Sequence, residues 1–127
     1  MKLLQEINFN SDGLVPAIIY DAADSRPLTL CYLNREAIEA TVRTGKVHLF
    51  RRSKGRLMIK GETSGHVQEV QEIAIDCAGN SLAIKVKQHV AACHVGYRSC
   101  YYRRYDPVAD DFVVSEEKIF EPGDVYK

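Results

Sequence analysis

The chain has 127 residues, of which 17 are basic and 17 are acidic, and hydrophobic residues make up 46%. This length predicts one domain over residues 1–127 with a real hydrophobic core. The balanced charge argues against a nucleic-acid partner, and the apolar runs are too short for a membrane span or a signal peptide. We therefore expect a cytoplasmic protein whose thiols stay reduced.

The first half of the chain predicts two strands and a helix. Residues 13–21 and 27–33 are apolar runs separated by the turn residues AADSR, which is typical of a hairpin. Residues 34–45 predict a helix, because Asn34 can cap its start and Gly45 suits the left-handed conformation at its end. The expected apolar stripe of this helix consists of Ala37, Ile38 and Val42.

The second half predicts more strands. They are expected at residues 47–50, 56–59, 67–76 and 81–88. In the last of these, Leu82, Ile84 and Val86 alternate with polar residues, so they should share one buried face. A further hairpin is expected around Asp106 and Pro107, followed by an exposed tail. The predicted fold class is mainly β with one or two short helices (α+β).

The cysteines fall into two groups. Cys31 lies in an apolar strand, which predicts a packing residue, whereas Cys77, Cys93 and Cys100 have polar or glycine-rich neighbours. Three thiolates with an open fourth position are the ligand set of a catalytic zinc site. The spacing is not the C-x-x-C of a structural zinc site, so buried free thiols remain the alternative.

Two other stretches are candidates for chemistry. His94 follows Cys93 and could be a fourth ligand, a general acid or base, or a solvated loop residue. The segment KGETSGHVQ (60–68) offers charge, hydroxyls and unhindered amides that could hold a phosphate, although such segments are often plain turns. The basic run RRSKGR (51–56) suits a solvated hairpin tip, and YYRRY (101–105) suits an amphipathic strand better than an RNA-stacking surface.

Read together, several segments resemble the phosphoribosyl-AMP cyclohydrolase family of histidine biosynthesis, over roughly residues 8–104. They are GLVPAI, LCYLNREAIEATVRTGKVHLF, RRSKGRL, KGETSGHVQ, IDC and ACHVGYRSCYYRR. The resemblance implies an intertwined homodimer with one zinc per subunit, shared across the interface. Cys77 of one chain and Cys93 with Cys100 of the other would be the zinc ligands, and His94 would transfer protons.

The resemblance also implies a substrate and a reaction. Zinc-dependent hydrolysis would open the purine ring of N1-(5-phosphoribosyl)-AMP, by attack of water at C6 and cleavage of the N1–C6 bond, in the third step of histidine biosynthesis. Zinc nucleobase deaminases attack the equivalent carbon but expel ammonia. The substrate-binding residues carried over from the family pattern are Arg52, Lys60, Thr63, Ser64, Gly65 and His66.

One part of the family pattern is missing. Its magnesium-binding stretch D-C-D-x-D reads Asp76, Cys77, Ala78, Gly79, Asn80 here. Magnesium prefers several hard oxygen ligands, so Asp76 alone predicts a weak magnesium site at most. Two alternative functions therefore remain open. One is a diverged paralogue acting on another purine-like or heterocyclic amidine, and the other is a non-catalytic zinc-binding dimer.

Overall fold

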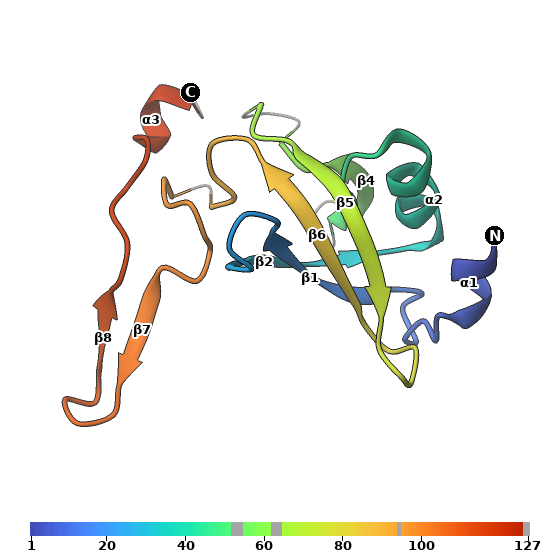
Figure 1. Cartoon of the computed structure of the whole chain (residues 1–127), viewed down its shortest axis with the longest axis horizontal. Coiled ribbons are helices and arrows are strands. Elements are labelled where there is room, and N and C mark those ends of the chain that lie inside the picture. The colour runs from blue at the N-terminus through green and yellow to red at the C-terminus, as the bar shows by residue number, and fades with distance from the viewer. Residues whose placement is uncertain (52–54, 62–64, 94, 126–127) are drawn as a thin grey trace.

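The structure is a computed structural model that describes residues 1–51, 55–61, 65–93 and 95–125. It is mainly β, as the sequence predicts (Figure 1). The strands are β1 (Val15–Asp21), β2 (Pro27–Leu33), β3 (His48–Arg51), β4 (Arg56–Ile59), β5 (Gln68–Ile75), β6 (Leu82–Gln88), β7 (Arg103–Asp106) and β8 (Asp111–Val114), and the helices are α1 (Lys2–Glu6), α2 (Arg35–Thr44) and α3 (Pro122–Val125). The sequence predicted β1 to β6 to within about two residues and a hairpin where β7 and β8 lie, but it predicted neither α1 nor α3.

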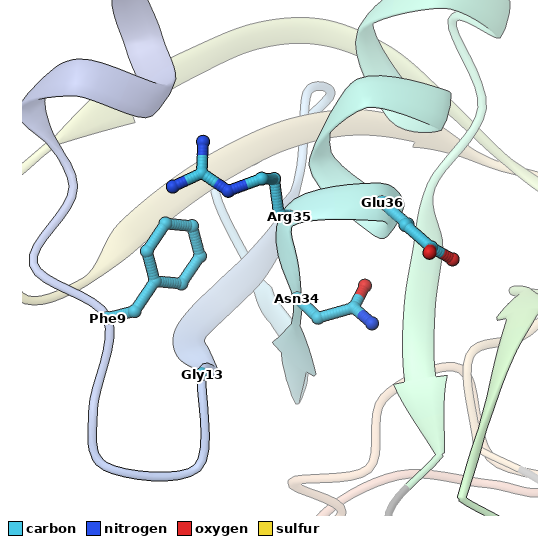
Figure 2. A pocket seen from close by; sticks show the side chains of 5 residues that line it. All are labelled: Phe9, Gly13, Asn34, Arg35 and Glu36. Atoms are coloured by element: carbon cyan, nitrogen blue, oxygen red, sulfur yellow. The ribbon is translucent and has the colours of Figure 1, made fainter.

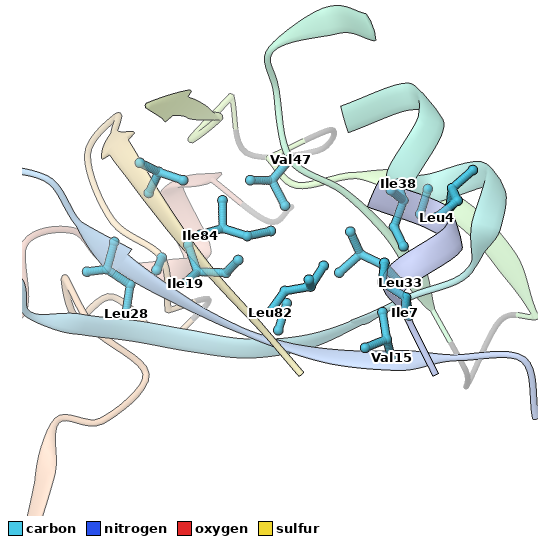
Figure 3. Close-up of a cluster of buried hydrophobic side chains, with 14 residues drawn as sticks. Leu4, Ile7, Val15, Ile19, Leu28, Leu33, Ile38, Val47, Leu82 and Ile84 are labelled. Atoms are coloured by element: carbon cyan, nitrogen blue, oxygen red, sulfur yellow. The ribbon is translucent and has the colours of Figure 1, made fainter. Parts of the chain in front are cut away.

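A four-stranded sheet in the order β2-β1-β6-β5 forms the centre of the molecule. The hairpin pairs β1–β2 and β5–β6 are antiparallel, and β1 and β6 are parallel. Leu82, Ile84 and Val86 are all buried, which confirms the alternation predicted for β6. They pack with alternate residues of β1 and with α1 and α2 in one core, which Figure 3 shows in close-up.

Helix α2 has the predicted ends. The side-chain oxygen of Asn34 accepts a hydrogen bond from the Ala37 N–H at 2.8 Å, so Asn34 is the N-cap. Gly45 has a φ of 74° and donates its N–H to the Thr41 carbonyl at 3.0 Å. A residue with a side chain is strained in this conformation, which explains why a glycine ends the helix.

The predicted apolar stripe of α2 is wrong at one position. Ala37 and Ile38 are buried, but Val42 is 47% exposed and Thr41 is buried in its place. The Thr41 hydroxyl donates to the Ala37 carbonyl at 2.7 Å and accepts from the His48 N–H at 2.9 Å. Hydrogen bonding at both ends lets a polar side chain take a core position.

The tail expected to be exposed after the C-terminal hairpin is mostly exposed, but it is tied to the rest of the chain. The Ile119 N–H donates to the Gly96 carbonyl at 2.6 Å, and Glu116 forms an ion pair with Arg26 at 3.2 Å. These contacts return the segment after β8 to the body, whereas the β7–β8 hairpin itself projects away from it (Figure 1). In the part of the chain that the structure describes, no helix is long and apolar enough to cross a membrane.

Candidate functional site

Cys93 and Cys100 lie together on the loop that follows β6. The Cys93 N–H donates to the Tyr97 carbonyl at 3.2 Å, which folds the loop back on itself. The Cys93 thiol is close enough to Cys100 to help raise the pKa of the Cys100 thiol, and the Val95 N–H donates to the Cys93 sulfur at 3.4 Å. Two cysteine sulfurs on one loop are ligands of the kind that zinc prefers, so this pair could hold a zinc ion.

The Cys100 segment is hydrogen-bonded to the edge strand β2. Its N–H donates to the Leu28 carbonyl at 2.7 Å, and the neighbouring Ser99 hydroxyl donates to the Pro27 carbonyl at 2.6 Å. Burial raises the pKa of the Cys100 thiol, and a hydrogen bond with Thr29 acts in the opposite direction. A bound cation reverses such a shift, because a coordinating thiol gives up its proton.

Lys60, at the start of the KGETSGHVQ segment, reaches this cysteine loop. Its Nζ donates to the Ala92 carbonyl at 2.9 Å, one residue before Cys93. Burial is the largest influence on the pKa of the Cys100 and Cys31 thiols, and the Lys60 ammonium acts against it on both. The structure therefore brings together two motifs that lie more than 30 residues apart in the sequence.

The end of the same segment is packed against the C-terminal part of the chain. The His66 ring is buried and meets the Phe120 ring edge-on, with centroids 4.9 Å apart. Gly65 donates its N–H to the Gly61 carbonyl at 2.8 Å. Gly61 has a φ of 88°, and a Cβ there would overlap the His66 backbone, so position 61 requires a glycine.

Four of the predicted site residues lie outside the described residues. They are Arg52, Thr63, Ser64 and His94. Their assigned roles stay predictions.

Cys77 is exposed in the turn between β5 and β6. Asp76 organises this turn: its Oδ1 accepts from the Asn80 N–H at 2.8 Å, and its Oδ2 accepts from the Ser81 hydroxyl at 2.6 Å. The Ser81 bond first, and then the Asn80 bond, lower the pKa of Asp76. Both oxygens of the predicted magnesium ligand therefore already have partners within the turn.

The segment after α1 is hydrogen-bonded to the same turn. Asn8 donates its N–H to the Gly79 carbonyl at 2.8 Å and its side-chain amide to the Ala78 carbonyl at 2.7 Å. Gly79 has a φ of 73° and lies so close to the Glu6 carbonyl that a Cβ would overlap it. The unpredicted helix α1 thus helps to position Cys77.

Cys77 and the Cys93–Cys100 pair lie beyond opposite ends of β6 (Figure 1). This strand has seven residues and so spans roughly 20 Å, whereas each sulfur ligand of a zinc ion lies about 2.3 Å from the metal. Within the described residues of one chain, no three His, Cys, Asp or Glu side chains gather in a way that could hold a metal. One chain alone does not bring the three predicted ligands together.

Cys31 is the fourth cysteine, and it is a packing residue, as predicted. It lies on β2 opposite Ala17 and packs against the hydrophobic core. Burial raises the pKa of its thiol to about 12, so at neutral pH it is not a thiolate.

Arg98 anchors the cysteine loop to the β1–β2 turn, a role that the sequence analysis did not identify. Its Nη2 donates to the Asp21 Oδ2 at 2.9 Å and to the Asp24 Oδ1 at 2.6 Å. The hydrogen bond from Arg98, and then the backbone bond from Arg26, lower the pKa of Asp24. Because its partners lie more than 70 residues away in sequence, no local pattern could have revealed this contact.

We expect Arg98→Met to destabilise the protein by about 1–2 kcal/mol at pH 7, because the mostly buried Asp21 carboxylate loses its charged partner. The pKa of Asp24 is lower in the folded protein than its ordinary value of 3.8. The ionised Asp24 therefore stabilises the fold above pH 3.8, and this contribution is lost as the pH falls through the lowered pKa. The difference between wild type and Arg98→Met should therefore shrink below about pH 4. Urea unfolding across this pH range measures it. Arg104→Met, on the exposed strand β7, is the matched control. If both variants destabilise the protein equally, the ion pairs of Arg98 do not have the stabilising role described here.

A pocket of about 450 Å³ lies at the start of α2 (Figure 2). It is lined by Phe9, Gly13, Asn34, Arg35 and Glu36. The Arg35 guanidinium lies over the Phe9 ring, 5.4 Å from its centroid. This pocket contains none of the predicted site residues, which lie in the cysteine loop, the KGETSGHVQ segment and the β5–β6 turn.

The class of protein follows from comparison of this arrangement with known proteins. The family model of phosphoribosyl-AMP cyclohydrolase matches residues 29–102, which include all four cysteines and the KGETSGHVQ segment. The protein is therefore an enzyme by family, a hydrolase. The chain belongs to the phosphoribosyl-AMP cyclohydrolase family.

Relatives of the same name cover most of this chain. The phosphoribosyl-AMP cyclohydrolase of Methanocella arvoryzae is 51% identical over 116 residues, covering 91% of this chain and 93% of the relative. That of Methanosarcina mazei is 50% identical over 115 residues, covering 91% and 92%. That of Methanothermobacter thermautotrophicus is 42% identical over 121 residues, covering 94% and 86%. The family resemblance drawn from the sequence motifs is confirmed.

Proposed function

We propose that this protein is a phosphoribosyl-AMP cyclohydrolase of histidine biosynthesis, which opens the purine six-membered ring of N1-(5-phosphoribosyl)-AMP with water. Family membership and relatives of that name at up to 51% identity support the proposal. The structural observation that carries it is the 2.9 Å hydrogen bond from Lys60 to the Ala92 carbonyl. This bond joins the candidate phosphate-binding segment to the candidate metal-binding loop, so that one substrate can reach both.

The reaction requires an electron-poor ring carbon that water can attack and a residue that transfers a proton. Substitution at N1 makes the purine ring amidinium-like, which leaves C6 electron-poor. Water adds to C6, the N1–C6 bond breaks, and N1 receives a proton. We assign this proton transfer to His94, and the binding of the substrate phosphates to the KGETSGHVQ segment with Arg52, because charged and hydroxyl donors suit phosphate oxygens.

We place one zinc per subunit on Cys93 and Cys100, with Cys77 of the partner subunit as third ligand. The nearness of Cys93 and Cys100 on one loop supports this placement, as does the exposure of Cys77 at the far end of β6. When bound, zinc acts as a Lewis acid that makes water a nucleophile at neutral pH. The shared ligand set makes the active enzyme a homodimer.

Lys60 has two roles in this proposal. Its hydrogen bond to the Ala92 carbonyl holds the backbone next to Cys93. Its ammonium also lies where it opposes the effect of burial on the Cys100 thiol, so it stabilises the thiolate form that metal binding needs.

The test is a steady-state assay of zinc-loaded enzyme with N1-(5-phosphoribosyl)-AMP, following ring opening by ultraviolet absorbance. We expect a kcat/KM of about 10⁴ M⁻¹s⁻¹ or more, the ordinary range for a dedicated enzyme, and growth of a histidine auxotroph that lacks the cyclohydrolase. The matched control is the Cys93→Ser protein. A zinc-loaded wild type without turnover of this substrate would instead favour the diverged paralogue.

We also predict that activity depends little on magnesium. Asp76 is the only carboxylate in the turn 76–80, and both its oxygens are occupied by the Asn80 N–H and the Ser81 hydroxyl. Magnesium sheds its water reluctantly and prefers several carboxylate ligands. Removing magnesium with a selective chelator should therefore change kcat/KM by less than about twofold.

Restoring the family carboxylates is the converse experiment. The double variant Ala78→Asp with Asn80→Asp should gain a response to magnesium in a titration, because two added carboxylates attract the cation. Ala78→Asn is the neutral control at the same site and should gain none. Strict magnesium dependence of the wild type would contradict this prediction.

A further inference from the structure

The ion pair between Glu116 and Arg26 lies beside the cysteine loop. The Glu116 Oε2 is 3.2 Å from the Arg26 Nη2, and the Glu116 Oε1 accepts a hydrogen bond from the Ser99 N–H at 3.3 Å. The Glu116 side chain is only 18% exposed. A carboxylate at this depth is costly without charged and hydrogen-bonding partners, so these two contacts fix where it lies.

The two members of this pair contact the backbone on both sides of Cys100. Glu116 accepts the N–H of Ser99, the residue before it, and the Arg26 Nη2 donates to the carbonyl of Tyr101, the residue after it, at 2.8 Å. Ser99 is fully buried, and its hydroxyl accepts from the Tyr101 N–H at 2.9 Å. One charged pair therefore holds the residues that flank Cys100.

The chain after Glu116 makes a second attachment, to the middle of the cysteine loop. The Ile119 N–H donates to the Gly96 carbonyl at 2.6 Å. Gly96 has a φ of 112°, and a Cβ there would overlap the Phe120 carbonyl. Residues 116–120 therefore contact the loop at two points, and Glu116 is one of them.

The contacts of Glu116 suit a positioning residue better than a metal ligand. Both of its oxygens already have protein partners, and it belongs to no group of three His, Cys, Asp or Glu side chains that could hold a metal among the residues that the structure describes. It reaches the proposed site through the Ser99 backbone, one residue from Cys100. Zinc binds sulfur at about 2.3 Å in a tetrahedral arrangement, so the direction of the Cys100 side chain decides whether its sulfur meets the ion.

We propose that the Glu116–Arg26 ion pair positions Cys100 for zinc binding, with Glu116 holding the Ser99 N–H and Arg26 holding the Tyr101 carbonyl. This inference rests on the zinc site of the proposed function. Loss of a partner that orients a metal ligand typically lowers metal affinity by about 10- to 100-fold, so the pair should be measurable through zinc binding itself.

The first test measures the zinc dissociation constant of the whole protein by competition with a chromogenic chelator, at one protein concentration for all variants. Glu116→Ala should raise this constant by about tenfold or more. Glu116→Gln keeps an acceptor for the Ser99 N–H but loses the charge that pairs with Arg26, so its effect should be smaller. Glu117→Ala is the matched control, because it removes the neighbouring exposed glutamate, and it should stay within about twofold of wild type.

The second test asks whether the two residues act as a pair. Arg26→Met should also raise the zinc dissociation constant. The double variant Arg26→Met with Glu116→Ala should have an effect smaller than the product of the two single effects, because either change breaks the same ion pair. Single effects that simply multiply would show that the two residues act independently, and would overturn the pair. If Glu116→Ala does not fold, Glu116→Gln takes its place in the cycle.

The third test needs no metal. In zinc-free protein, the Ser99 amide should exchange its hydrogen at least about tenfold faster in Glu116→Ala than in Glu117→Ala, because its hydrogen-bond acceptor is lost. Equal exchange in the two variants would overturn the contact. Zinc binding of wild-type strength in folded Glu116→Ala would overturn the positioning role and leave the proposed zinc site intact, even if the variant unfolds more easily. A wild type that binds no zinc would instead overturn the proposed site, and the positioning role with it.

Discussion

Replacing Cys93 with serine should lower the zinc content of the purified protein from about one ion per chain to below about one tenth. A serine hydroxyl stays protonated at neutral pH and is a poor ligand for zinc, so the site keeps only two sulfur ligands. Cys100→Ser and Cys77→Ser should have the same effect for the same reason.

Cys31→Ser is the matched control for these variants. Its thiol packs against the core, and burial raises its pKa to about 12, so it should contribute nothing to zinc binding. Metal analysis of the four purified single variants, with thermal unfolding to establish that each is folded, makes the comparison. Full zinc retention in Cys93→Ser, or zinc loss in a folded Cys31→Ser, would refute the assignment.

Mixing two zinc-free variants should restore zinc and activity if the ligands come from two chains. In a heterodimer of Cys77→Ser with Cys93→Ser, one site has Cys93 and Cys100 from the first chain and Cys77 from the second. The other site lacks both altered ligands. After subunit exchange at equal concentration, about one quarter of all sites should be intact, because half of the dimers are mixed and each has one good site.

The arrangement of the loop supplies the control for this experiment. In the proposed site Cys93 and Cys100 come from the same chain, where they lie on one loop. A mixture of Cys93→Ser with Cys100→Ser therefore cannot rebuild a site and should recover nothing. Zinc content and kcat of each mixture, measured against the unmixed variants, are the readouts. Recovery in the second mixture, or none in the first, would refute the shared site.

Both experiments test the same structural fact, the separation of the ligands along β6. If zinc links the two chains, removing it with a strong chelator should also weaken the dimer, because a ligand that binds only the dimer stabilises it by mass action.

The sequence by itself determined most of the local structure. Helix α2 begins at Asn34 and ends before Gly45 because the capping hydrogen bond and the left-handed conformation are properties of single residues. The burial of Leu82 and Ile84 followed from strand alternation, a property of neighbouring residues. The motifs also established the family, because they preserve residue types at fixed spacings.

Only the tertiary structure decided which of these residues meet. It joined Lys60 to the Ala92 carbonyl and Arg98 to Asp21, pairs that lie 32 and 77 residues apart. It also placed Cys77 at the far end of β6 from Cys93, and among the described residues of one chain no group of three possible ligands gathers to hold a metal. Such contacts depend on how strands pair and how loops return, and these choices minimise the free energy of the whole chain. A spacing of sixteen residues between two cysteines in the sequence cannot reveal that a strand of roughly 20 Å holds them apart.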